Sequence, residues 1–362
     1  MRALLRLFER LRPLFDEGAL LRPMRCVYDA AESFFFCPAT RTERAPHIRD
    51  PLDIKRYMAT VIVALVPCVA AAVYFFGLRV LAMILVSYVA GGAVEVAFAV
   101  VRRREINEGF LVTGLIFPLI LPPGLPLWMV AVGVAFGVFF GKEIFGGTGR
   151  NPFNPALVGR CFLAIGYPEP MSSTWIVPGA ERFGRLAQYV GASSADALSG
   201  ATPLIAAKGG ALAPLGDLIL GCTAGSAGET CAVAIVLGGV FLIATRVANW
   251  RVVAGTLGSF LVLAALFHLA NPTRFPSAHW QLFAGGLLFG AFFMATDPVT
   301  SPTASGAKWI YGALIGATTV LIRSFSGFVE GVMFAILLGN IAAPLLDECV
   351  YAIRLRRLHH EG

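Results

Sequence analysis

The succession of apolar segments after Arg56 limits the possible folds of this chain more than any other feature. Ten stretches dominated by apolar side chains follow one another between residues 57 and 348. Stretches of this kind are typical of membrane-spanning helices, although several are shorter than a full span of about 20 residues. We expect helices near residues 57–76, 80–101, 109–123, 126–141, 153–168, 229–246, 251–270, 281–297, 308–323 and 329–348.

The composition argues against a soluble enzyme and for an all-α polytopic membrane protein. Of the 362 residues, 57% are hydrophobic and 14% are charged, whereas a soluble domain has about 45–50% and about 25%. The seven cysteines form no C-x-x-C pair and no close cluster with histidine, so no metal site is expected. The net charge of +7 comes from arginines in the N-terminal arm and at loop ends, which indicates membrane orientation and not nucleic-acid binding.

The chain divides into five parts. The first, 1–56, is a polar cytoplasmic arm in which leucines recur at helical spacing against arginines from Arg2 to Arg12. This pattern predicts an amphipathic helix at the membrane surface. A signal peptide is not expected, because no apolar run of the required length precedes residue 57. The other parts are a five-helix repeat, an external loop, a second five-helix repeat and a basic cytoplasmic tail, at residues 57–168, 169–228, 229–348 and 349–362.

The two groups of apolar segments resemble each other. Gly114–Phe117 is similar to Gly286–Phe289, each string runs on into a proline, and the next segments open on Trp128 and Trp309. Because each group has an odd number of segments, two related repeats would be inverted in the membrane, as in many transporters. Short helices broken by proline or glycine are tolerated where the backbone lines a cavity. Chance similarity among helices rich in glycine and leucine is the alternative explanation.

Basic residues predict the orientation of the chain. With the N-terminus in the cytoplasm, the inside segments carry 22 lysines and arginines and the outside segments carry 6, with Arg160 inside a span and left out. Cytoplasmic segments are enriched in basic residues. We therefore expect both termini in the cytoplasm and residues 169–228 outside.

Three acids in or near the apolar segments are candidates for function. An acidic side chain inside a span is unfavourable, so Glu95 is a candidate for function, unless it is hydrogen-bonded to a neighbouring helix or wetted at the interface. Asp297 ends its segment before Pro298, so it either satisfies local backbone amides or binds a cation or proton. Asp347 lies nearer the cytoplasmic end, where an interfacial acid without function is as good an explanation.

Several strings of small or turn-forming residues allow a structural and a functional reading. Gly91–Gly92 lies one turn before Glu95 and permits close approach either of a helix or of a flat ligand. Asn151–Pro155 twice presents Asn before Pro, which is the pattern of a helix N-cap. The glycine-rich string Gly221–Glu229 opens a span and is no nucleotide-binding motif, because no strand precedes it. Thr202 lies in a turn of small residues, and general physical chemistry alone does not single it out.

A set of strings resembles one family of membrane proteins. Asp196-x-x-Ser199-Gly200-Ala201-Thr202 resembles the flavinylation motif of integral-membrane flavoproteins, in which the threonine hydroxyl forms a phosphoester with FMN. Further similar strings are His47–Asp50, Asp53–Arg56, Glu105–Phe110, Leu121–Pro123, Gly141–Gly149, Asn154–Ala156, Gly225–Glu229 and Phe292–Pro298. Together they resemble the family that holds the B-type membrane subunit of the sodium-translocating NADH:quinone oxidoreductase and the D-type membrane subunit of the Rnf ferredoxin:NAD complex. The long polar arm favours the quinone-reductase branch, while the short link Gly77–Arg79 and the long stretch 171–195 depart from the pattern of many members.

The resemblance implies cofactors and site residues. Thr202 would carry covalent FMN, attached by an external flavin transferase, with Asp196, Ser199, Gly200 and Ala201 forming the motif around it. The same subunit would hold a noncovalent riboflavin. Quinone would bind near Gly91, Gly92 and the N-terminal arm. The acids Glu95, Asp297 and Asp347 would take part in sodium movement.

The resemblance also implies partners and a location. These are an NADH-dehydrogenase flavoprotein subunit, a second subunit with covalent FMN and small membrane subunits, all in the bacterial inner membrane. Electrons from NADH would reach quinone with coupled sodium translocation, the flavin supplying one- and two-electron chemistry. Two alternatives stay open: the Rnf subunit, and a channel or transporter without redox chemistry that uses the same repeat fold.

Overall fold

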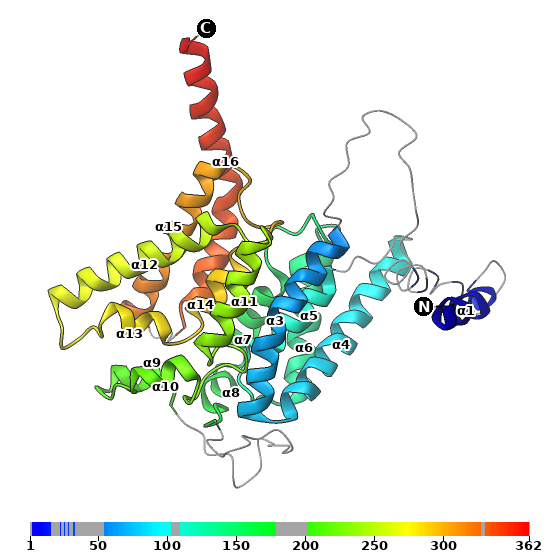
Figure 1. Ribbon diagram of the computed structural model, residues 1–362, viewed down its shortest axis with the longest axis horizontal. Coiled ribbons are helices and arrows are strands. Elements are labelled where there is room, and N and C mark those ends of the chain that lie inside the picture. The colour runs from blue at the N-terminus through cyan, green and yellow to red at the C-terminus, as the bar shows by residue number, and fades with distance from the viewer. Residues whose placement is uncertain are drawn as a thin grey trace.

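The computed structural model describes residues 2–15, 22, 25, 28, 32, 54–102, 109–178, 201–326 and 330–361. Every regular element within these ranges is a helix, and most of them pack side by side in one bundle (Figure 1). Helix is present in each of the ten segments in which the sequence predicts it. The protein is therefore an all-α polytopic membrane protein, as its composition predicts.

The helices of the first half come in an order that matches the predicted segments. They are α3 (Ile54–Phe76), α4 (Arg79–Arg102), α5 (Gly109–Leu119), α6 (Leu127–Val138) with the π-helical segment η3 (Phe139–Glu143), and α7 (Pro155–Gly166). Three short helices follow at one end of the bundle, and these are α8 (Pro168–Ser173), α9 (Pro203–Lys208) and α10 (Leu215–Leu220).

The second half has a broken helix at its centre. Its elements are α11 (Ala232–Ala244), α12 (Trp250–Ala270), α13 (Ala278–Phe283), α14 (Leu287–Phe289), the π-helical segment η4 (Gly290–Met294), α15 (Ser305–Phe325) and α16 (Val332–Glu361). Among the described helices, four are long and apolar enough to cross a membrane, namely α3, α4, α12 and α16. The shorter apolar helices are α5, α7 and α11.

Corresponding helices of the two halves make corresponding contacts. In the first half α4 packs on α6 and α6 on α7, and in the second half α12 packs on α15 and α15 on α16. The halves meet where α3 packs against α11 and where α7 packs against α16. This shared pairing supports two related five-segment units, which the similar glycine-containing strings predict.

The first two membrane helices are joined by a tight turn. Gly77 has φ +81°, a backbone conformation that suits glycine because it has no Cβ. The turn brings Arg79, the first residue of α4, next to the chain that follows α5. Its guanidinium donates to the carbonyl oxygens of Pro123, Gly124 and Leu125 at 2.9, 3.2 and 2.8 Å. Carbonyl oxygens of the turn between α5 and α6 are thus satisfied inside the protein, as non-helical backbone at membrane depth requires.

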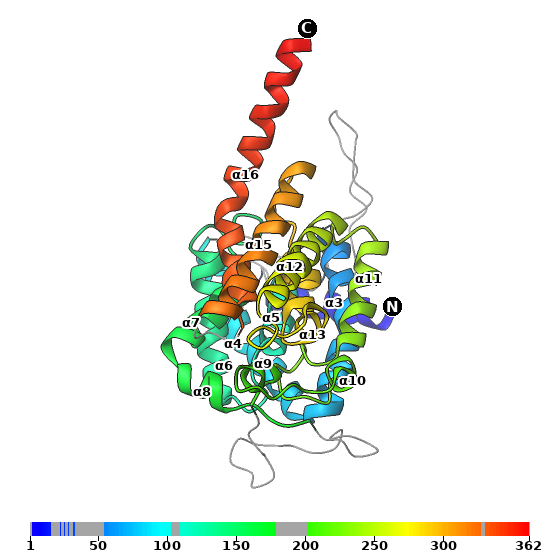
Figure 2. The ribbon, with the colours of Figure 1, turned by 90° about the vertical axis from the view of Figure 1, so that its left-hand side faces the viewer.

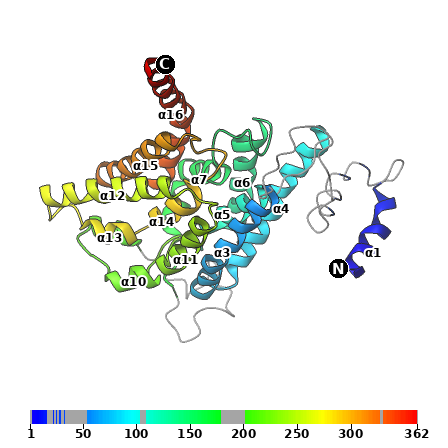
Figure 3. The ribbon, with the colours of Figure 1, turned by 45° about the horizontal axis from the view of Figure 1, so that its top comes forward.

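The two ends of the chain differ in how they relate to the bundle. The helix α1 (Arg2–Leu11) is the amphipathic helix that the sequence predicts, and the short helix η1 (Arg12–Leu14) follows it. Helix α1 lies outside the bundle, on the side of α4 (Figure 3). At the other end, α16 continues to Glu361 and projects beyond the bundle (Figure 2). The predicted boundary at residue 348 therefore falls within a continuous helix, because nothing after Glu348 breaks it.

Candidate functional site

Thr202 begins α9 and is buried. Its Oγ1 accepts a hydrogen bond from the backbone N–H of Ile205 at 3.4 Å, and Pro203 occupies the first helical position. Threonine is a preferred N-cap, and proline is favoured directly after it. The side chain of Thr202 is 5% exposed, whereas the preceding Ala201 is exposed. The other motif residues Asp196, Ser199 and Gly200 lie outside the described residues.

A cavity of about 340 Å³, here called the Thr202 cavity, opens beside this hydroxyl. The glycine-rich string of the sequence forms one wall, so two motifs that are separate in the chain meet here. Pockets for small molecules carry a few polar groups on an otherwise apolar wall. The lining residues are Thr202, Pro203, Leu204, Thr223, Ala224, Gly225, Ser226, Glu229, Thr230, Phe283, Gly285 and Glu330.

A buried group of charges lies behind the Thr202 cavity. Arg160 of α7 donates to Glu229 Oε1 at 3.2 Å, to the carboxylate of Glu330, and to Ser226 Oγ at 3.4 Å. The Arg160 and Glu229 side chains are each 2% exposed. Glu229 Oε2 and Arg160 Nε have no hydrogen-bond partner among the described residues. This arrangement ties the first half of the bundle to the second.

This group of charges was not predicted from the sequence, although a signal was present. An arginine inside an apolar span is as unfavourable as a glutamate there and marks a functional candidate by the same rule. Arg160 is such a residue, and Glu330 falls at the start of the predicted segment 329–348.

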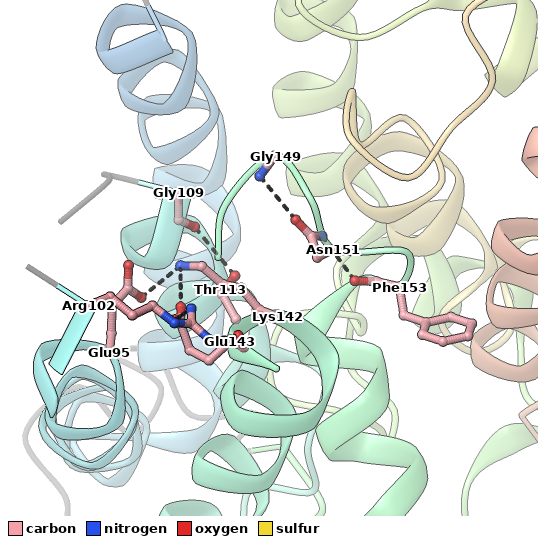
Figure 4. Close-up of polar contacts among 9 residues, drawn as sticks. All are labelled: Glu95, Arg102, Gly109, Thr113, Lys142, Glu143, Gly149, Asn151 and Phe153. Atoms are coloured by element: carbon pink, nitrogen blue, oxygen red, sulfur yellow. Dashed lines mark hydrogen bonds and ion pairs between the residues drawn. The ribbon is translucent and has the colours of Figure 1, made fainter. Parts of the chain in front are cut away.

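Glu95 is paired with a lysine that comes from the π-helical segment η3. Lys142 Nζ lies 2.7 Å from Glu95 Oε2, and the two side chains are 3% and 6% exposed. Glu143, the next residue, accepts from Arg102 Nη1 at 3.0 Å and lies 3.9 Å from Lys142 Nζ (Figure 4). Irregular π-helical turns often occur at functional sites, and this one aims a lysine into the interior. Glu95 therefore has a basic partner, Lys142, inside the bundle.

The aromatic ring of Phe110 packs against the glycine pair Gly91–Gly92. A Cβ atom at Gly91 would lie 2.7 Å from Phe110 Cε2, and one at Gly92 would lie 3.4 Å from Phe110 Cε1. Phe110 belongs to α5, so these glycines let the helices α4 and α5 approach each other. The space that the sequence left open for a flat ligand is occupied by this ring, and a role in quinone binding stays a prediction.

Asp297 faces a second cavity, here called the Asp297 cavity, which has a volume of about 690 Å³. Its carboxylate accepts from the backbone N–H of Val299 at 3.2 Å and from Thr300 Oγ1 at 3.1 Å. These bonds agree with the structural reading of an acid before proline, yet the side chain also lines an open space. Both halves of the chain contribute to the lining, which is Tyr57, Met58, Val61, Gly109, Val112, Thr113, Ile116, Lys142, Thr148, Asn151, Asn154, Pro155, Leu242, Val247, Ala248, Phe293, Thr296, Asp297, Pro298 and Val299.

The polar groups of the Asp297 cavity include one without a partner. Thr148 Oγ1 is buried and has no hydrogen-bond partner among the described residues. Asn154 caps α7 by accepting from the N–H of Ala156 at 3.0 Å, as the Asn-Pro pattern predicts, and Asn151 Nδ2 donates to the carbonyl of Phe153 at 3.0 Å. A ligand with hydrogen-bonding edges would find a free hydroxyl here.

Asp347 has a different environment. Its carboxylate accepts from the backbone N–H groups of Thr303 and Ala304 at 2.7 and 2.8 Å, and from Thr303 Oγ1 at 2.9 Å. Both oxygens are thus engaged at the N-terminus of α15, which is a capping arrangement. Of the three candidate acids, Asp297 lines the Asp297 cavity, Glu95 reaches it through Lys142, and Asp347 does neither.

The two cavities lie toward opposite ends of the bundle. The start of α3, the end of α4 and the projecting part of α16 share one end, and α8, α9 and α10 occupy the other (Figure 1). The Asp297 cavity includes the start of α3, and the Thr202 cavity includes the start of α9.

Comparison with known proteins gives a family match and long similar chains. Residues 41–355 match the model of the "NQR2, RnfD, RnfE family". The chain is 37% identical to the B-type subunit of the Na(+)-translocating NADH-quinone reductase of Azotobacter vinelandii, with 95% of each chain covered. It is 36% identical to the same subunit of Ectopseudomonas mendocina, over 95% of each chain, and of Klebsiella pneumoniae, over 98% of this chain and 99% of the relative.

Proposed function

Because this chain belongs to the NQR2, RnfD, RnfE family, we propose that it is the flavin-carrying membrane subunit of a sodium-pumping NADH:quinone reductase. It is a subunit of an ion-pumping respiratory complex, as are its relatives, which are named as B-type subunits of the Na(+)-translocating NADH-quinone reductase. In this proposed role the subunit takes electrons from NADH through partner subunits and passes them to quinone. The near-complete coverage by these quinone-reductase relatives favours this assignment over the Rnf complex.

Thr202 is the proposed attachment point of FMN, and its hydrogen bonding suits that role. The hydroxyl oxygen acts as an acceptor in the N-cap of α9, so its hydrogen is not needed there. Replacing this hydrogen by a phosphoryl group keeps the acceptor and directs the new group toward the Thr202 cavity. Gly225 and Gly285 leave space in the wall, and three hydroxyls, of Thr223, Ser226 and Thr230, offer hydrogen bonds. This buried threonine beside a cavity is the single observation that carries the proposal.

The bound flavin would supply one- and two-electron transfer, while the protein positions it and sets its electrostatic surroundings. A flavin that gains an electron gains negative charge, and a buried charge needs compensation. Arg160 lies behind the Thr202 cavity in a group that also contains Glu229 and Glu330. Within the described part of the chain, Arg160 Nε and Glu229 Oε2 have no hydrogen-bond partner, so this group can rearrange its hydrogen bonds.

The Asp297 cavity is the proposed site of the noncovalent riboflavin. Riboflavin has no phosphate, so its site needs hydrogen-bonding groups more than a cluster of cations. The free hydroxyl of Thr148 and the threonines Thr113 and Thr296 provide such groups beside apolar side chains. The proposed sodium path follows Asp297 and the Glu95–Lys142 pair at the same cavity, with Asp347 as the remaining candidate.

The first test uses the fluorescence of the denatured chain. We expect Thr202→Val to abolish flavin fluorescence that persists in SDS, because only a covalent flavin survives denaturation. Thr223→Val is the matched control, since Thr223 lines the same cavity, and it should keep the fluorescence. Loss of the N-cap of α9 in Thr202→Val should lower the stability of the protein by about 1 kcal/mol, so Thr202→Val should still insert into the membrane.

Other results would contradict the proposal. Fluorescent Thr202→Val protein would place the attachment elsewhere. A wild-type chain with no SDS-resistant flavin would favour a channel or transporter without redox chemistry. Quinone-dependent NADH oxidation by the purified complex, measured with and without sodium, then tests the proposed coupling ion.

A further inference from the structure

A third cavity, here called the basic pocket, lies at the end of the bundle that carries α9. It encloses about 840 Å³, part of it open to solvent. Three cations line it, each from a different element: Lys208 from α9, Arg274 from the link after α12, and Arg323 from α15. No acid is among its described lining residues, which are Leu204, Ala207, Lys208, Arg274, Phe275, Pro276, Trp280, Gln281, Arg323, Ser324, Phe325 and Ser326.

Arg323 is buried in this pocket with part of its guanidinium unsatisfied. Arg323 is 6% exposed. Nη1 donates to the carbonyl oxygen of Gln281 at 2.8 Å, while Nε and Nη2 have no hydrogen-bond partner among the described residues. Buried donors without partners are rare and call for an explanation, such as a bound group. A guanidinium fork is well suited to the oxygens of a phosphate.

The other two cations are exposed. Lys208 Nζ donates to the carbonyl oxygen of Ser326 at 3.0 Å, which holds it beside the pocket. Arg274 lies over the ring of Phe275 at 5.3 Å and near that of Phe325 at 6.0 Å. Among the described residues, no carboxylate forms an ion pair with either side chain. The pocket therefore combines one buried and two exposed positive charges.

Glu229 is the acid that acts electrostatically on Arg323. It lines the Thr202 cavity and not the basic pocket; its Oε1 accepts from Arg160, and its Oε2 has no hydrogen-bond partner among the described residues. The positive charge facing the basic pocket is thus not neutralised from within it. An anion is the chemical complement.

The surface beside the pocket is apolar. Phe267 of α12 packs against Phe275 and Phe325, with ring centroids 5.4 and 5.6 Å apart. Next to these rings, Leu266 and Leu269 of α12 are 56% and 77% exposed, and Phe325 of α15 is 63% exposed. Since α12 is long and apolar enough to span a membrane, this surface suits acyl chains, and the basic pocket lies at its end.

We propose that the basic pocket binds the phosphodiester headgroup of an anionic phospholipid, whose acyl chains lie along α12 and α15. The phosphate accepts hydrogen bonds from Arg323 and neutralises charge from Lys208 and Arg274. A zwitterionic headgroup is a poor match, because its ammonium or trimethylammonium group would enter a site with three cations. Basic pockets between membrane helices on the matrix or cytoplasmic side bind anionic headgroups, and the same charge complementarity applies to this pocket.

The test uses the complex that contains this chain, extracted in detergent and stripped of lipid. Phosphatidylglycerol, phosphatidylcholine and inorganic phosphate are each added, and thermal unfolding and native mass spectra are recorded. Phosphatidylglycerol should raise the melting temperature and remain bound in the mass spectrum, while the other two should do neither. In Lys208→Gln/Arg274→Gln the concentration of phosphatidylglycerol needed for half the effect should rise about tenfold or more.

Two controls separate a lost site from a damaged fold. Arg251→Gln removes an arginine with the same kind of ring contact, 5.2 Å over Trp250 at the other end of α12, and it should respond like the wild type. Lys208 and Arg274 are exposed, so their double variant should assemble normally in the complex. Arg323→Gln is added as a second variant, and it should also lose the response.

Three results would overturn the proposal. An unchanged response to phosphatidylglycerol in Lys208→Gln/Arg274→Gln would place the lipid elsewhere on the complex. An equal response to phosphatidylcholine would show that the headgroup charge is not recognised. A full response to inorganic phosphate alone would identify a free anion and not a lipid as the occupant.

Discussion

At the scale of single residues, the Glu95–Lys142 pair is the most informative contact. A charge inside a membrane helix is unfavourable unless it is paired or wetted, and these two side chains are nearly inaccessible and 2.7 Å apart. Removing one partner of a buried ion pair typically destabilises a protein by about 3–5 kcal/mol, because the other charge is left alone. The pair can therefore serve structure, ion movement or both, and single variants do not distinguish these roles.

A double variant distinguishes them. We expect Glu95→Gln to lower both the melting temperature and the sodium-dependent rate of quinone reduction, since it leaves Lys142 only the more distant carboxylate of Glu143, 3.9 Å away. In Glu95→Gln/Lys142→Gln the two amides replace the ion pair, and most of the lost thermal stability should return. If Glu95 belongs to the sodium path, the rate and its sodium dependence should stay impaired although stability recovers.

The opposite pattern would remove Glu95 from the proposed path. Normal turnover in the stable double variant, with unchanged sodium activation, would show a purely structural pair. SDS-resistant flavin fluorescence, which we propose to arise from Thr202, serves as the control for assembly, because Glu95 lies away from the Thr202 cavity.

Residue roles were predictable from sequence only where they depend on near neighbours. The N-cap of Asn154 and the local hydrogen bonds of Asp297 follow from the proline beside each of them. The partners of buried charges do not, because Glu95 and Lys142 are 47 positions apart, and Arg160 and Glu330 are 170 apart. Such pairs exist only once helices from different parts of the chain are packed, and no periodicity records them.

At the scale of elements, the packing of α12 on α15 depends on glycine. A Cβ atom at Gly316 of α15 would lie 2.2 Å from the carbonyl oxygen of Thr256 and 2.1 Å from Ser259 Oγ. A Cβ at Gly312 would lie 2.6 Å from the carbonyl oxygen of Val252. Small residues at such positions let membrane helices approach closely, where dispersion contacts and not the hydrophobic effect hold them together.

Gly316→Ala should therefore separate the two helices. We expect it to destabilise the protein by about 1–3 kcal/mol, as overpacking in a close-packed interior does, and to lower the melting temperature of the purified complex. Gly258→Ala on α12 is the control, because a Cβ there meets nothing within 4 Å. It should be neutral or stabilising by about 0.5–1 kcal/mol, since alanine favours helix over glycine. Equal effects of both changes would contradict the packing argument.

Asp347 gives a second prediction about an element. Its carboxylate caps the start of α15 through Thr303 and Ala304, so Asp347→Asn should keep part of the cap and lower stability by no more than about 1 kcal/mol. Asp347→Ala should lower it further, by about 0.5–2 kcal/mol relative to the wild type. If sodium dependence changes in Asp347→Asn while the melting temperature does not, the acid has a role beyond capping.

The helices themselves were predictable, but their irregularities were not. Apolar runs mark the positions of α3, α4 and α12, and the chain does fold into helices there. The π-helical turns η3 and η4 insert an extra residue without a distinctive sequence signal. Since η3 is what brings Lys142 to Glu95, the central feature of that site had to be seen in the structure.

At the scale of the whole molecule, the Asp297 cavity and the Thr202 cavity lie at opposite ends of the bundle. The projecting part of α16 and the start of α3 lie at the end near the Asp297 cavity, and α9 lies at the other (Figures 1 and 2). The count of basic residues, 22 against 6, predicts that the first end is cytoplasmic and the Thr202 end is external. The structure places these groups at opposite ends of the bundle, and labelling decides which end faces which side.

Two natural cysteines provide the labels. Cys222 and Cys349 are exposed and lie toward opposite ends of the bundle. In variants that keep one cysteine each, an impermeant maleimide should label Cys222 from outside intact cells and Cys349 only in inverted vesicles.

Burial raises the pKa of the Cys222 thiol, and the nearby Asp217 carboxylate adds to the shift. Less thiolate is then present at neutral pH, so its labelling should be slow at pH 7 and faster at pH 9. Labelling of Cys222 only from the cytoplasmic side would reverse the predicted orientation.

The last helix has a practical consequence. At about 1.5 Å per residue, the 30 residues of α16 form a rod of roughly 45 Å, whereas a bilayer core is about 30 Å thick. A protein fused to the C-terminus without a flexible spacer would thus be held at a fixed angle and away from the bundle. Such a fusion would serve as a rigid marker in electron micrographs, large enough to align particles whose remaining mass lies hidden in a detergent belt.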